Sequence, residues 1–130
     1  MVIINWLSVF LWCRLIFFFS SIPGIETGLG FWDIILRKGA HIFEFGTLCV
    51  LLYLAWKNTI KMSAVKFFVF VSGFALLYAA SDEFHQTFVA NRDGNIRDVL
   101  IDAAGIFLAT FYIFKKGGLC ERKTQETGKG

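Results

Sequence analysis

The chain has 130 residues, of which 56% are hydrophobic and 18% aromatic, and its formal net charge is +3. Soluble domains average about 45–50% apolar residues, whereas here the apolar residues also form long runs and the mean hydropathy is +0.61. This pattern excludes an ordinary soluble domain, and so small a net charge gives no reason to expect a nucleic-acid partner.

Four apolar segments approach the length of about 20 helical residues that a bilayer core requires. In chain order they are residues 2–19, 39–56, 64–80 and 99–114. The fourth is short, but it can extend upstream through residues 95–98. None alternates steadily between polar and apolar residues, as the strands of a membrane barrel do. We therefore predict an all-α membrane protein, a bundle of four transmembrane helices.

The prediction divides the chain into two parts. Residues 1–114 form the transmembrane domain, and the polar, basic segment 115–130 is expected to be a disordered tail that meets anionic headgroups. The first span lacks a basic leader and has only a weak cleavage site at residues 20–24, so we expect it to be retained. Arg14, towards the end of this span, is expected to snorkel to the headgroups.

The basic residues predict an orientation. With the N-terminus inside, eight lie on the cytoplasmic side and four on the other, Arg14 being left out. This excess fits the positive-inside rule with both termini in the cytoplasm. Residues 20–38 and 81–98 are then expected to face outward.

Standard cofactor signals do not occur in the sequence. The three cysteines include no CxxC pair, and an odd count argues against a disulfide framework. There is also no Walker loop, GxGxxG or HExxH stretch. We therefore expect no cofactor and no metal centre.

Ionisable side chains collect at the outer ends of the predicted spans. Lys38, His41 and Glu44 open the second span at spacings of three, which places them along one helical face. The third span ends, and the fourth begins, with a polar run that contains Asp82, Glu83, His85, Gln86, Arg92, Asp98 and Asp102. Polar groups at membrane depth are costly and need partners. We therefore expect these residues to share one site.

Several functions are open to such a cluster. Its His and carboxylate side chains include zinc or manganese ligand types. A carboxylate–His pair can instead act as a general base, with Arg92 or Lys38 holding an anionic group such as phosphate. A proton or ion relay is a third function. The structural alternative is that residues such as Arg37, Asp93, Arg97 and Asp98 only meet headgroups or clamp the helices together. The residues alone do not choose among these.

Three stretches resemble the VanZ-like family. They are KGAHIFEFG from Lys38, SDEFHQ from Ser81, and NRDGNIRDVLIDAAG ending at Gly105. They match the family's Lys-x-x-His-x-x-Glu-Tyr, Asp-Glu-x-x-Gln and Asp-Val-x-x-Asn-x-x-Gly stretches in order and spacing, over residues 37–108. The characteristic positions are Lys38, His41, Glu44, Asp82, Glu83, Gln86, Arg92, Asp98 and Gly105. Two positions depart: Phe45 replaces the usual Tyr, and Asp102 stands where Asn is common.

The resemblance implies a multi-pass protein of the bacterial cytoplasmic membrane. The member that names the family is associated with low-level teicoplanin resistance. We therefore expect an outward-facing cluster that binds, modifies or shields a lipid headgroup, a wall precursor or a lipoglycopeptide. Its expected ligand-binding residues are the characteristic side chains listed above together with Asp102, and the candidates for catalysis are His41, Glu44, Asp82 and Glu83. The alternatives are an acid–base or metal-assisted hydrolase of a lipid substrate and a structural subunit of a membrane complex. Each of these functions is compatible with a homo-oligomer.

Overall fold

The computed structural model describes most of the chain: residues 1–24, 27–92 and 94–127, with residues 118–127 by their backbone only. Within these ranges the chain forms four helices and no strand, which confirms the all-α prediction. The helices are α1 (Val2–Ser21), α2 (Phe31–Lys57), α3 (Ala64–Gln86) and α4 (Ile96–Thr127). By length and composition, α1, α2 and α3 can each cross a membrane.

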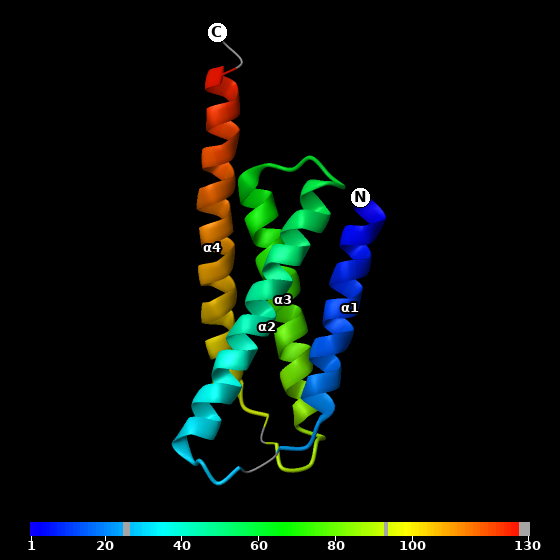
Figure 1. Ribbon diagram of the computed structural model, residues 1–130, viewed down its shortest axis with the longest axis vertical. Coiled ribbons are helices and arrows are strands. Elements are labelled where there is room, and N and C mark those ends of the chain that lie inside the picture. Colours follow the sequence, from blue (N-terminus) through cyan, green and yellow to red (C-terminus); the bar gives the residue numbers. More distant parts are fainter. Residues whose placement is uncertain (25–26, 93, 128–130) are drawn as a thin grey trace.

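The fourth helix differs from the other three. Its apolar stretch between Asp102 and Lys115 covers about 18 Å, less than the about 30 Å of a bilayer core. A fourth membrane crossing therefore stays a prediction. The helix does not end near Phe114 as expected but runs on to Thr127, beyond the ends of its neighbours (Figure 1). The start of the segment expected to be disordered is thus a continuation of α4.

Polar residues extend two helices past the predicted spans. α2 begins at Phe31 rather than Gly39, and α3 continues from Ala80 to Gln86. Hydropathy marks where a chain is apolar, but the backbone ladder of a helix continues wherever no residue breaks it. These extensions contain the polar residues at the predicted outer ends of α2 and α3.

The helices alternate in direction along the bundle. α4 packs extensively on α2 and α3, and α1 packs on α2 and less extensively on α3. The start of α1 and the end of α4 lie at one end of the bundle, while the α1–α2 and α3–α4 connections lie together at the other (Figure 1). We call this second end the loop end. Which side of the membrane it faces is a prediction from the basic residues.

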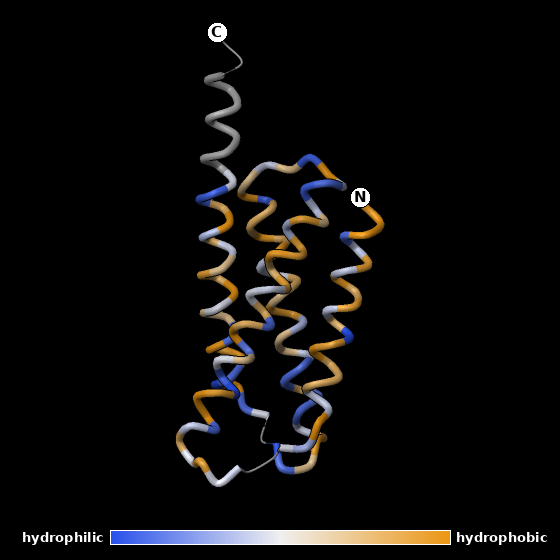
Figure 2. The backbone as a smooth tube through the Cα atoms, in the orientation of Figure 1, coloured by the Kyte–Doolittle hydropathy of each residue, from blue (hydrophilic) through white to orange (hydrophobic). Residues whose placement is uncertain are grey.

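Apolar side chains fill the interior and also cover the outside. Phe45, Leu48, Leu52, Val71 and Ile106 are fully buried. Yet many large apolar side chains are exposed along the helices. Figure 2 shows orange apolar residues along the helices, with blue polar residues mostly towards the two ends of the bundle. An apolar exterior of this extent fits a lipid environment, because soluble monomers rarely expose large apolar patches.

Glycine allows the two connections at the loop end to touch. The Gly24 amide donates to the Ala90 carbonyl over 3.3 Å, and a Cβ on Gly24 would collide with the Asn91 carbonyl oxygen. Within the bundle, Gly105 faces Ile42 of α2. Gly73 in α3 differs, because a Cβ added there would meet no atom of another described element within 4 Å. The hydrogen bond between Gly24 and Ala90 therefore joins the α1–α2 and α3–α4 connections into one surface.

Candidate functional site

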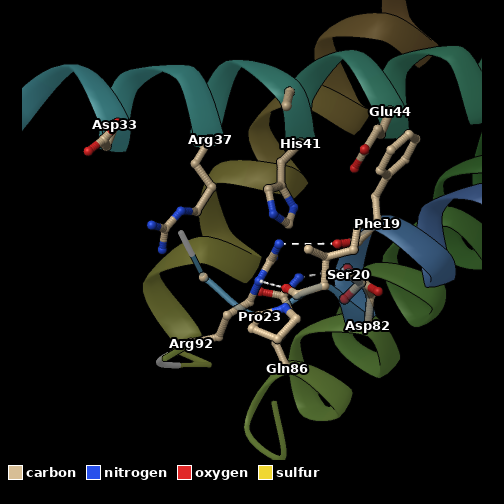
Figure 3. A pocket seen from close by; sticks show the side chains of 13 residues that line it. Phe19, Ser20, Pro23, Asp33, Arg37, His41, Glu44, Asp82, Gln86 and Arg92 are labelled. Atoms are coloured by element: carbon tan, nitrogen blue, oxygen red, sulfur yellow. Dashed lines mark hydrogen bonds between the residues drawn. The ribbon is translucent and has the colours of Figure 1, made fainter. Parts of the chain in front are cut away.

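A pocket of about 440 Å³ lies at the loop end of the bundle. Its walls are the end of α1, the first turns of α2, the end of α3 and the connection after α3 (Figure 3). This volume is within the usual range of small-molecule sites. The pocket brings together five of the predicted residues, His41, Glu44, Asp82, Gln86 and Arg92.

His41 joins the pocket to a carboxylate behind it. Its Nδ1 is 3.6 Å from Oδ2 of Asp102, and the side chains are 13% and 2% exposed. This is an ion-pair distance, longer than a direct hydrogen bond. The ring also stacks on Phe45, with centroids 6.3 Å apart. Because Nδ1 is buried on the Asp102 side, Nε2 is the nitrogen left to the pocket.

Asp82 presents a carboxylate oxygen to the pocket wall. The residue is 5% exposed, and its Oδ2 accepts a hydrogen bond from Gln86 Nε2 over 3.0 Å. Within the described ranges, Oδ1 is buried and has no hydrogen-bond partner, and neither does Oγ of Ser20, which lies beside it (Figure 3). Buried polar atoms are nearly always paired, so Oδ1 is suited to accept a hydrogen, either from the Ser20 hydroxyl beside it or from a ligand.

Arg92 has a structural role in addition to lining the pocket. Its Nε donates to the Ile22 carbonyl over 3.0 Å, and its Nη2 donates to the Phe19 carbonyl over 3.1 Å (Figure 3). The last carbonyls of a helix lack intrahelical partners, so the guanidinium caps the end of α1. This forked geometry is specific to arginine.

A second guanidinium, that of Arg37, reaches the same pocket from α2. Burial, and after it the positive charge of Arg37, lower the pKa of Arg92, while the carboxylates of Asp82, Glu44 and Glu83 act in the opposite direction; a guanidinium stays protonated at neutral pH. Two neighbouring cations repel each other, and an anion between them relieves that repulsion. Phosphate and carboxylate are the groups that arginine recognises best.

The remaining predicted residues lie outside the pocket lining. Lys38 and Asp98 form an ion pair of 3.1 Å between α2 and α4, with side chains 40% and 36% exposed. Glu83 turns to the connection before α4, where its Oε1 accepts the Asn95 amide over 2.9 Å. Their placement assigns these three residues to holding α4 in position.

Sequence reasoning missed part of the lining. Asp33 precedes His41 by eight residues, so the helical spacing that linked His41 to Glu44 could have found it. Arg37, four residues before His41, lies on the same helical face and is among the residues for which the sequence leaves a headgroup or helix-clamping role open; the structure places it in the pocket lining. Ser20, Ile22 and the other lining residues from the end of α1 carry no such signal, because apolar and small residues at a helix end are common. The sequence could not show that α1 closes this side of the pocket.

The metal interpretation finds no support in the arrangement of ligands. Across the described ranges, no three His, Cys, Asp or Glu side chains are grouped so as to hold a metal ion. His85 in particular is not part of this pocket's lining: its Nε2 is 3.1 Å from Ser21 Oγ, and its ring lies 4.4 Å from that of Phe17. Asp93 lies outside the described residues.

The fold and the site define a helical membrane protein with a polar pocket at one end of its bundle. A family model described as VanZ/LLP1 matches residues 5–116. The chain therefore belongs to the VanZ/LLP1 family and is a membrane protein of the VanZ type. The match confirms the resemblance seen in the sequence and extends it to both sides of residues 37–108. No curated protein and no solved structure matches the chain.

Proposed function

We propose that this protein binds the anionic headgroup of an envelope amphiphile, a membrane lipid or a lipid-linked wall precursor, at the outward face of the bacterial cytoplasmic membrane. The observation that carries the proposal is that both cationic and acidic side chains line the pocket. Arg37 and Arg92 supply two guanidinium groups, and Asp82 offers a buried oxygen without a partner among the described residues.

The pocket complements a headgroup with two kinds of polar group. The arginines suit a phosphate or carboxylate, while the acceptors of Asp82 and Glu44 suit hydroxyl or ammonium hydrogens. About 440 Å³ has room for such a headgroup, but a whole lipoglycopeptide exceeds the usual volume of a small-molecule site. Under this proposal, teicoplanin tolerance would follow from binding of the lipid and not of the antibiotic.

A second candidate function, acid–base hydrolysis of the bound lipid, is favoured by the pair of His41 and Asp102. A carboxylate beside one imidazole nitrogen fixes the ring and stabilises its protonated form, which is the arrangement of a general base. His41 Nε2 would take a proton from an attacking water, and the two guanidinium groups would stabilise the charge that develops on the substrate.

Lipid that copurifies with the full-length protein from bacterial membranes tests the binding proposal. We expect mass spectrometry to find anionic amphiphiles enriched with the wild type and depleted with Asp82→Asn and Arg37→Gln. Lys38→Gln, which changes a cation outside the pocket, is the matched control and should retain them. The same lipids in all four preparations would contradict the proposal.

Turnover separates the two functions. If the protein is a hydrolase, His41→Gln should retain the copurified lipid and lose release of its headgroup, while the wild type releases it. In a Gram-positive host, teicoplanin and vancomycin susceptibility at matched protein levels then show whether binding affects either antibiotic. Tolerance that is equal in the wild type and in Asp82→Asn would detach the pocket from that phenotype.

A further inference from the structure

A second, smaller pocket of about 250 Å³ lies between α1 and α3 near the loop end. Its walls are largely aromatic, with Phe17 from α1 and Tyr78 and Phe84 from α3, and Phe88 follows just after α3. Asp82 lines this pocket as well as the polar one. Asp82 therefore lies between the two pockets, with the polar pocket on one side of its carboxylate and the aromatic pocket on the other.

The aromatic pocket opens on the outer surface of the bundle. Phe84 and Phe88 are 68% and 75% exposed, so this wall faces the surroundings of the protein. Among the packed helix pairs, α1 and α3 make the least extensive contact. Near this pocket, α1 contacts α3 through the hydrogen bond between Ser21 and His85 and through the ring contact between Phe17 and His85.

A lipid headgroup in a pocket at the end of a helical bundle needs a path for its chain back to the bilayer. That path has to be apolar, must begin at the headgroup site and must open laterally. The aromatic pocket fits such a path, because it adjoins the polar pocket at Asp82 and has exposed phenylalanines at its outer wall, although Ser81 and His85 add polar groups to its lining.

We infer that the α1–α3 pocket holds the first part of the hydrocarbon chain of the amphiphile whose headgroup occupies the polar pocket. This inference rests on the proposed headgroup function and adds to it the place where the hydrocarbon chain of the ligand is held. The ligand is a chain-bearing lipid that enters sideways between α1 and α3, not a water-soluble phosphate. Asp82 then lies at the junction of headgroup and chain.

Two probes with one headgroup test the inference: glycerol 3-phosphate, and the same molecule carrying one oleoyl chain. Binding of each to the full-length protein is measured by titration calorimetry in detergent. Ser81→Trp fills the aromatic pocket from its exposed edge. Leu77→Trp is the matched control, because Leu77 is 75% exposed on the same helix and does not line the pocket.

We expect Ser81→Trp to weaken binding of the oleoyl probe at least about tenfold and to leave glycerol 3-phosphate unaffected, because the indole blocks only the chain. Leu77→Trp should bind both probes as the wild type does, and Arg37→Gln should weaken both. Phe84→Ala, which removes an exposed wall, should weaken the oleoyl probe alone by about threefold. This variant decides the test if Ser81→Trp does not fold.

Two other outcomes have distinct meanings. If Ser81→Trp and Phe84→Ala bind both probes like the wild type, the chain leaves the polar pocket elsewhere and the inference is overturned, while the headgroup proposal stands. If the wild type binds neither probe, the headgroup proposal fails and the inference fails with it.

Discussion

Asp102 lies directly behind His41, with 3.6 Å between its Oδ2 and the Nδ1 of the imidazole. Neither atom has a hydrogen-bond partner within the described ranges of the chain, and both are buried. Each is therefore the main polar neighbour of the other. A carboxylate at this position can carry a negative charge beside the ring, where an amide would offer only a dipole.

The pair should be measurable as stability. Asp102→Ala leaves a buried ring nitrogen facing a cavity, and we expect it to lower the free energy of unfolding by about 1–3 kcal/mol. Asp102→Asn keeps an acceptor of the same shape and should cost less than half of that. Reversible unfolding in mixed micelles measures both values. Equal costs for the two variants would show that shape, and not an acceptor beside His41, matters here.

Glu83 should act through α4 rather than through the pocket. Its Oε1 accepts the Asn95 amide at the start of α4, so Glu83→Ala removes the partner of that donor. We expect a loss of about 1–3 kcal/mol and faster proteolysis near residues 94–96. Glu83→Gln keeps an acceptor oxygen and should stay close to the wild type. A loss of lipid binding in Glu83→Gln at unchanged stability would instead return Glu83 to the binding site.

The ion pair between Lys38 and Asp98 should contribute little to stability. Both side chains are more than a third exposed, and solvent screens such pairs. In a double-mutant cycle with Lys38→Ala and Asp98→Ala, we expect a coupling energy below about 1 kcal/mol. A coupling of several kcal/mol would mean that the pair is more shielded from water than its exposure indicates.

Two glycines should respond in opposite directions to the same substitution. At Gly24 a methyl group would collide with the Asn91 carbonyl, so Gly24→Ala has to separate the two connections and should destabilise the loop end. At Gly39, in α2, a built Cβ has no atom of the described residues within 4 Å. Gly39→Ala should therefore be neutral or stabilise the helix by up to about 1 kcal/mol. Thermal unfolding of both variants checks the contrast.

Much of the fold was predictable because apolar runs of bilayer length have few other structures available to them. The helix ends were less predictable. α2 starts eight residues before Gly39, because Phe31, Ile34 and Ile35 continue the helix although charged residues lower the local hydropathy. The extension of α4 to Thr127 was missed for the same reason, since a polar segment can be helical without being apolar.

The candidate site was predictable only where its residues share a helical face. Spacing alone related His41 to Glu44 and Asp82 to Gln86, and the structure brings these four together. Spacing could not show that Glu83, one residue from Asp82, turns to Asn95 instead. Nor could it show that Arg92 binds the carbonyls of Phe19 and Ile22, because main-chain acceptors have no sequence signature.

The two hydrogen bonds from Arg92 to the end of α1 limit which residues can replace it in related proteins. A replacement at this position must still reach two main-chain oxygens at the end of α1, and only another forked cation does so. Arg37 lines the same pocket, and its side chain makes no hydrogen bond or ion pair with another described residue. Relatives that adapt to a different headgroup are therefore expected to vary Arg37 first, while keeping Arg92 unchanged.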